Sequence, residues 1–199
     1  MPDKVNTQQR LIHPSSIAIV LVLMGVTALF MALSIAYMYA LGNGAGDPVK
    51  LPWLFSINTV VLLSSSLFFW KARKSYENQS YVRHLRDLIL ALSATTLFLV
   101  LQIIAWTWMF NHQLPIQKDT SHAYLYAISI LHFAHVIAGI PALIMYMLRF
   151  WSESKRADGS LFFIDERASR KLRLISTYWH FIDFLWVYLM LFFAVSSLF

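Results

Sequence analysis

Five long apolar segments, each separated from the next by a polar stretch, constrain the fold of this chain more than any other feature. A bilayer core about 30 Å thick takes roughly 20 apolar residues of helix. Apolar residues make up 58% of the 199-residue chain and charged residues 13%, whereas soluble domains contain about 25% charged residues. We therefore predict an all-α polytopic membrane protein, a single membrane domain over residues 1–199 that forms a bundle of five transmembrane helices. The predicted spans cover approximately residues 16–41, 53–70, 88–110, 123–148 and 175–198.

The positions of the basic residues predict the orientation of the bundle. Fourteen of the sixteen Lys and Arg residues fall in the N-terminal tail or in the segments after the second and fourth spans, and only Lys50 and Lys118 lie in the other two segments. Cytoplasmic loops carry the excess of basic residues. We therefore expect the N-terminus in the cytoplasm and Phe199 on the periplasmic side of a bacterial inner membrane. The interhelical positions of the bases account for the net charge of +6, so we predict no nucleic-acid partner.

Polar side chains recur at helical spacing inside the predicted spans. Asn58 and Ser65 are seven residues apart in the second span, as are Thr95 and Gln102 in the third. Polar groups in a membrane usually face other helices, because each needs a hydrogen-bond partner. We therefore predict structural interhelical contacts for six residues. These are Asn58, Gln102, His132, His135, His180 and Asp183.

The fourth span contains two histidines, His132 and His135, whose spacing permits ligation of one metal or haem iron. That span has no acidic residue, and the depth predicted for His180 differs from that of His135 by roughly 10 Å. The chain also has no cysteine, which excludes disulfides, iron–sulfur clusters and thiolate copper sites. We predict no catalytic residue, no bound metal and no other redox cofactor in this chain.

His180 and Asp183 lie one helical turn apart in the last span. A carboxylate inside a membrane is a candidate functional group by default. One hypothesis is a structural clasp, held by hydrogen bonds to another helix such as the one that bears His132 and His135. The other is a small membrane transporter that uses His180 and Asp183. No second carboxylate lies in any predicted span, which disfavours a complete proton path within this chain.

The stretch YWHFIDFLWVYL in the last span resembles the last-helix signature of subunit III of the haem–copper terminal oxidases, in its compact five-helix bacterial form. HFAHVIAG, which contains Gly139, is similar to a second motif of that family, and Asn58 and Gln102 lie in two further matching elements. The last-helix match rests on Tyr178, Trp179, His180, Phe181, Asp183 and Trp186.

Three departures from the family pattern limit what the resemblance implies. The first span lacks a glutamate that the family associates with proton uptake, and Ala105 and Trp106 replace the Glu-Tyr of a Gln-x-x-Glu-Tyr element. The role of that glutamate is therefore not carried over to this chain. The two N-terminal helices of the seven-helix form are also absent, which puts the lipid-holding cleft of that form in doubt.

The resemblance implies a noncatalytic accessory subunit of a proton-pumping oxidase in aerobic respiration, whose complex transfers electrons from cytochrome c to oxygen. Such a subunit has no redox centre of its own, because haem and copper are bound by partner subunits. It would pack against catalytic subunit I, beside subunit II and a small subunit IV, bind phospholipid and sustain proton uptake and stability. A quinol oxidase, a nitric oxide reductase accessory protein and a supercomplex with a quinol-oxidising complex remain open alternatives.

Overall fold

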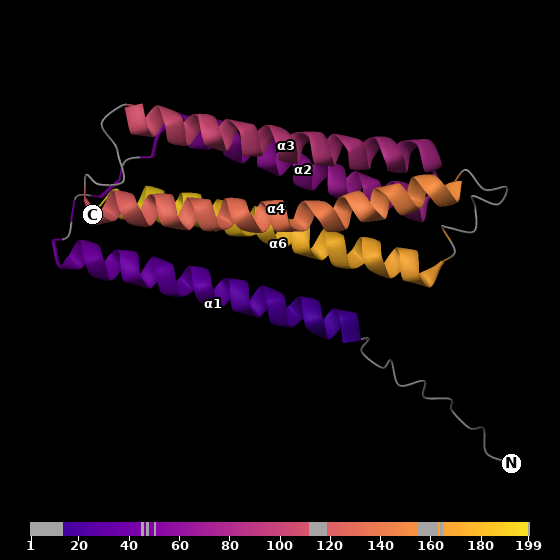
Figure 1. The fold of residues 1–199 in the computed structure, drawn as a ribbon, viewed down its shortest axis with the longest axis horizontal. Helices are drawn as coiled ribbons and strands as arrows, with labels where there is room; N and C mark the ends of the chain where they lie inside the picture. The colour runs from indigo at the N-terminus through magenta and orange to yellow at the C-terminus, as the bar shows by residue number, and fades with distance from the viewer. Residues whose placement is uncertain are drawn as a thin grey trace, which may run out of the picture.

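The computed structural model describes residues 14–44, 46, 48–49, 51–111, 119–154, 163 and 165–198. The described chain is all-helical, and its five long helices lie side by side as a bundle (Figure 1). Each is long and apolar enough to cross a membrane, which confirms the predicted fold class. The helices are α1 (Pro14–Gly42), α2 (Trp53–Glu77), α3 (Tyr81–Asn111), α4 (Thr120–Ser154) and α6 (Glu166–Ser196).

Helices α2 and α3 form a tight antiparallel hairpin. The sequence predicts a polar break between the second and third spans, but in the structure only residues 78–80 leave the helix. Gln79 at the turn has a φ of 52°, and the amide N–H of Asn78 donates to the carbonyl oxygen of Lys74. Residues 71–77 and 81–87 contain neither Gly nor Pro, so nothing in these segments ends a helix. Their polar side chains mark only the predicted limit of the hydrocarbon.

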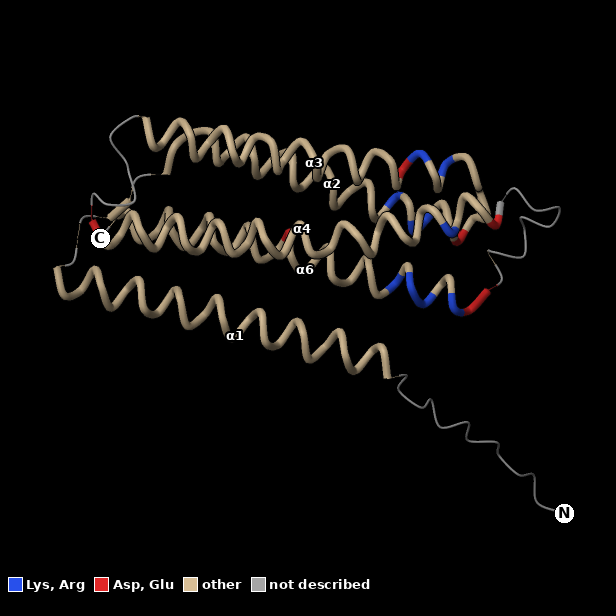
Figure 2. Tube along the Cα trace, viewed as in Figure 1, with Lys and Arg blue, Asp and Glu red and all other residues tan. Residues whose placement is uncertain are grey.

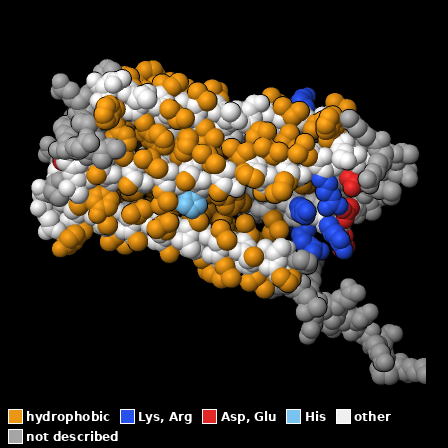
Figure 3. Space-filling view, in the orientation of Figure 1, with side chains coloured by type: hydrophobic (Ala, Val, Ile, Leu, Met, Phe, Trp, Pro, Cys, Tyr) orange, Lys and Arg blue, Asp and Glu red, His pale blue; other side chains and the backbone are white. Residues whose placement is uncertain are grey.

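Charged residues gather at one end of the bundle, where α2 and α4 end and α3 and α6 begin (Figure 2). Apolar side chains cover most of the remaining surface seen in Figure 3, and Lys and Arg cluster near this same end. Large exposed side chains such as Leu67, Met145 and Phe184 suit a surface that contacts lipid or other transmembrane helices. The side of the membrane that this basic end faces stays a prediction.

Two groups of buried apolar residues fill the bundle. One lies near the basic end and includes Phe69, Phe150 and Trp179, and the other occupies the rest of the interior and includes Phe98 and Trp186. Trp179 and Trp186 are seven residues apart on the inward face of α6. Asp183 lies between them on that face and is only 2% exposed. The folded bundle therefore encloses this carboxylate where its two apolar clusters meet.

Candidate functional site

Two polar pairs link α2 to α3 in the middle of the bundle. The side-chain amide of Asn58 donates to Oε1 of Gln102 at 2.7 Å, and the hydroxyls of Ser65 and Thr95 lie 2.9 Å apart. All four side chains are fully buried. The partners are seven residues apart on each helix, so an antiparallel hairpin brings them together at two successive levels.

Helix α6 joins this hairpin through three of its aromatic and imidazole side chains. The indole N–H of Trp179 donates to Oγ1 of Thr95 at 3.4 Å, and the indole N–H of Trp186 donates to Oγ1 of Thr59 at 3.1 Å. Nδ1 of His180 lies 2.6 Å from the hydroxyl of Ser66. The helix that His180 contacts is therefore α2, and the suggestion of the helix bearing His132 and His135 is wrong.

Asp183 has no such partner. Neither of its carboxylate oxygens has a hydrogen-bond partner within 3.5 Å in the described part of the chain, although the hydroxyl of Ser66 is close enough to act as a weak donor to it. A buried polar group without a hydrogen bond carries a desolvation cost of about 1–3 kcal/mol, and more if it is charged. The bundle therefore holds an unsatisfied carboxyl group beside the Ser66–His180 pair.

His132 and His135 lie one turn apart on α4, but their rings pack against different residues, His132 against Phe98 and His135 against Phe30. His132 is fully buried, its two ring nitrogens have no partner among the described residues, and its ring centroid lies 4.8 Å from that of Trp186. Nδ1 of His135 instead donates to the carbonyl oxygen of Leu131 at 2.7 Å. No group of three potential metal ligands forms within the described ranges, and the expected absence of a metal stays a prediction.

Gly139 allows α4 to approach α6 closely. A Cβ at this position would lie 2.8 Å from Cε1 of Tyr178 and 2.9 Å from Cζ3 of Trp179. The hydroxyl of Tyr178 donates to the carbonyl oxygen of His135 at 2.8 Å, one turn earlier on α4. Residues of the last-helix motif and of the HFAHVIAG motif therefore meet in one helix–helix contact.

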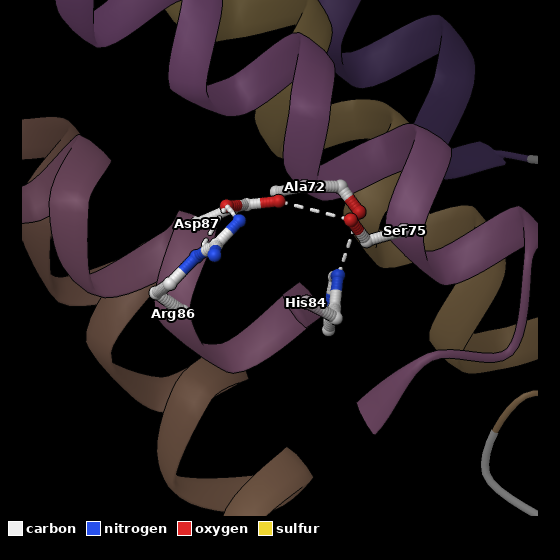
Figure 4. A network of polar contacts seen from close by, with 5 residues as sticks. All are labelled: Ala72, Ser75, His84, Arg86 and Asp87. Carbon is white, nitrogen blue, oxygen red and sulfur yellow. Dashed lines mark hydrogen bonds and ion pairs between the residues drawn. The ribbon is translucent and has the colours of Figure 1, made fainter. Parts of the chain in front are cut away.

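A further polar cluster at the basic end is absent from the sequence predictions (Figure 4). Asp87 is 2% exposed and accepts hydrogen bonds from Ser75 at 2.9 Å and from Nη2 of Arg86 at 3.0 Å. His84 is fully buried; its Nδ1 donates to the carbonyl oxygen of Ala72 at 2.7 Å. A third helix joins the cluster because Nε2 of His84 lies 3.2 Å from the hydroxyl of Tyr146 on α4.

The inventory of buried ionisable groups predicted from the sequence is therefore incomplete. His84 and Asp87 precede the predicted third span, yet they belong to α3, and His122 at the start of α4 is also buried. Spacing could have revealed the first two, because His84, Leu88, Ala91 and Thr95 continue one helical face. His122 pairs with Asp119, whose Oδ1 lies 2.7 Å from its Nδ1.

These contacts define a polytopic α-helical membrane protein whose internal polar groups connect neighbouring helices. No protein-family model matches the chain. Among curated proteins, it is 26% identical over 166 residues to cytochrome c oxidase subunit 3 of Corynebacterium diphtheriae (strain ATCC 700971 / NCTC 13129 / Biotype gravis). The similarity covers 79% of this chain and 76% of that relative, and we regard the relative as a distant homologue.

Proposed function

We propose that this chain is a noncatalytic accessory subunit of a haem–copper oxidase, the counterpart of subunit III, in a bacterial inner membrane. The observation that carries this proposal is the similarity to cytochrome c oxidase subunit 3 along most of both chains. The internal contacts support it, because the residues of the last-helix motif are those that connect α6 to α2, α3 and α4. In this proposal haem and copper belong to partner subunits, and this chain stabilises the complex.

Affinity purification of the tagged full-length chain in a mild detergent tests the proposal. We expect a haem-containing, oxygen-consuming complex to co-purify with it. Reduced cytochrome c and a quinol, supplied separately, identify the electron donor. A monodisperse chain without haem-containing partners would contradict the proposal, and substrate flux through that chain in liposomes would favour the transporter hypothesis.

We also propose that the chain binds phospholipid near its basic end. A groove of about 280 Å³ between α1, α4 and α6 is lined by apolar residues that include Ile19 and Ile175. Lys171 is exposed one turn before Ile175 on α6, and basic side chains attract anionic headgroups. Phospholipid analysis of the purified complex should show retained anionic lipid that decreases in Lys171→Gln. Lys74→Gln, on α2, is the matched control.

Sustained turnover is the activity that this subunit would protect. We expect its loss from the complex to leave the initial rate of oxygen reduction unchanged and to shorten the time over which that rate is maintained. Oxygen uptake recorded over many turnovers, with and without the chain, measures both quantities. An immediate loss of oxygen reduction in an otherwise assembled complex would contradict an accessory role.

A further inference from the structure

Polar side chains from four helices lie at one level in the middle of the bundle. Asn58 of α2 donates to Gln102 of α3 at 2.7 Å, and the neighbouring Thr59 accepts from the indole N–H of Trp186 on α6 at 3.1 Å. The ring centroid of Trp186 in turn lies 4.8 Å from that of His132 on α4. Because these contacts connect the four helices at the same level, Asn58, Gln102, His132 and Trp186 form a polar layer.

His132 borders the face of α3 that carries Gln102. The ring centroid of His132 lies 6.0 Å from that of Phe98, and Gln102 follows Phe98 by one turn on the same buried face of α3. Asn58, Gln102 and His132 are all fully buried. The imidazole and the amide pair therefore share one enclosed part of the interior.

The hydrogen-bonding capacity of the polar layer is only partly used. Oδ1 of Asn58, Nε2 of Gln102 and both ring nitrogens of His132 have no hydrogen-bond partner among the described residues. A neutral imidazole has one donor and one acceptor, and the amide pair keeps one NH₂ group and one carbonyl oxygen whichever amide donates. These groups are complementary, yet no direct bond joins the imidazole to the amide pair. Since such burial is costly, a ligand that both donates and accepts would stabilise the layer.

Water has the chemistry that these atoms require. One molecule donates twice and accepts twice, and buried water in proteins typically makes about three hydrogen bonds to polar groups that are otherwise unsatisfied. Lipid tails cannot take this role, because hydrocarbon offers no hydrogen bond. The polar layer contains no Lys, Arg, Asp or Glu, and a single imidazole beside neutral amides is a poor ligand set for a metal ion. The layer therefore favours a small neutral ligand.

His84 provides an internal comparison, because it is also fully buried but has its partners within the fold. Its Nδ1 lies 2.7 Å from the carbonyl oxygen of Ala72, and its Nε2 lies 3.2 Å from the hydroxyl of Tyr146. Burial of a histidine in this bundle is thus compatible with complete satisfaction by protein atoms. His132 differs in having neither ring nitrogen satisfied in this way.

We propose that the polar layer binds internal water, which bridges the imidazole of His132 to the amide pair of Asn58 and Gln102. The bridge connects α4 to the hairpin of α2 and α3 at a level where His132 makes no direct hydrogen bond to either helix. This site lies inside the chain and does not depend on the proposed function. Failure of an oxidase to co-purify would leave it untouched.

Transfer of magnetisation from water to the imidazole N–H groups tests the proposal in the full-length chain. The chain carries ¹⁵N-histidine, is reconstituted in phospholipid bilayers and is measured by magic-angle-spinning NMR. Pairwise labelling identifies the two signals without mutation, because Leu131–His132 and Arg83–His84 are the only Leu-His and Arg-His pairs in the sequence. We expect transfer to His132 to be several times faster than transfer to His84. Equally slow transfer to both rings would overturn the proposal.

Two substitutions test whether the water bridges to the amide pair. Gln102→Leu removes one side of the bridge and leaves His132 unaltered, so transfer to His132 should slow to the rate of His84. Ser65→Ala is the matched control, because it removes the hydroxyl of the other polar pair between α2 and α3, 2.9 Å from that of Thr95. We expect no change in transfer to His132 in this variant.

Two results with these variants would contradict the bridge. Fast transfer that persists in Gln102→Leu would mean that water reaches His132 without bonding to the amide pair. Equal slowing in Gln102→Leu and Ser65→Ala would mean that both variants only alter the packing of the hairpin. If Gln102→Leu yields no folded chain, the comparison of His132 with His84 in the wild-type chain still decides whether the layer binds water.

Discussion

Two buried carboxylates, Asp87 and Asp183, are equally hidden but differently satisfied. Each is 2% exposed. Asp87 accepts hydrogen bonds from Ser75 and Arg86, whereas neither oxygen of Asp183 has a hydrogen-bond partner within the described residues. The first carboxylate is therefore integrated into the isolated fold, and the second carries a cost that the isolated fold does not offset. This difference separates a buried carboxylate that stabilises the bundle through hydrogen bonds from one that does not.

Substitution of Asp87 should produce the largest loss of stability. Asp87→Ala removes the acceptor for both Ser75 and Arg86 and leaves the buried hydroxyl of Ser75 without this partner. We expect the free energy of unfolding to fall by about 2–3 kcal/mol, the typical effect of an unsatisfied buried polar group. Denaturation of the purified chain in mixed detergent micelles measures the change. A loss below about 0.5 kcal/mol, the size of an ordinary surface substitution, would remove the contrast between the two carboxylates.

Asp183→Asn should affect the isolated chain and the complex differently. In the isolated chain no hydrogen bond is lost, so the free energy of unfolding should stay unchanged or rise by up to about 1 kcal/mol. In the complex, we expect weaker retention of the subunit or faster loss of activity under sustained turnover, with haem content and initial oxygen reduction preserved. Denaturation of the isolated chain measures its stability, and oxygen uptake by the complex measures its activity. Destabilisation of the isolated chain as great as that of Asp87→Ala would show that the fold itself depends on the carboxylate.

His84→Phe tests whether the cluster around Asp87 acts as one unit. The substitution preserves an aromatic ring among Tyr76, Tyr146 and Phe150 but removes the hydrogen bonds to Ala72 and Tyr146. We expect a loss of about 1–2 kcal/mol in the free energy of unfolding, measured as for Asp87→Ala. The double variant combines His84→Phe with Asp87→Ala. If its free energy of unfolding is no lower than that of Asp87→Ala alone, the two residues stabilise the same contact between helices. Fully additive losses would instead show that they act separately.

Part of this polar architecture could be predicted from the sequence. Asn58 and Ser65 are spaced like Thr95 and Gln102, and an antiparallel hairpin pairs such positions without further information. His84 and Asp87 were not predicted as buried, because the polar residues around them resemble a loop. In the structure α3 continues past the predicted limit of the hydrocarbon and includes both residues. The contact between His180 and Ser66 depends on how α6 packs among α1, α2 and α4, and periodicity along one helix does not specify its neighbours.

The pair formed by Asn58 and Gln102 should show a moderate coupling that does not depend on charge. A double-mutant cycle with Asn58→Leu and Gln102→Leu isolates the bond between their amides, which spans 2.7 Å. We expect a coupling of about 0.6 kcal/mol and at most about 1.7 kcal/mol, the average and the largest value found for hydrogen bonds between membrane helices. Denaturation in mixed micelles at two salt concentrations provides the measurement. A coupling that falls markedly with salt would contradict a neutral, fully buried pair.

Of the substitutions expected to destabilise the chain, Arg86→Gln should have the smallest effect, although it removes a hydrogen-bonded ion pair. The guanidinium side chain is 63% exposed while the carboxylate of Asp87 is 3% exposed, so solvent and salt screen the attraction from one side. Ser75 still donates to Asp87 in this variant, and the expected loss is therefore below about 1 kcal/mol. Unfolding measured at low and high salt should show a difference between wild type and variant that shrinks as salt increases. A loss comparable to that of Asp87→Ala would mean that Arg86, and not Ser75, satisfies this carboxylate.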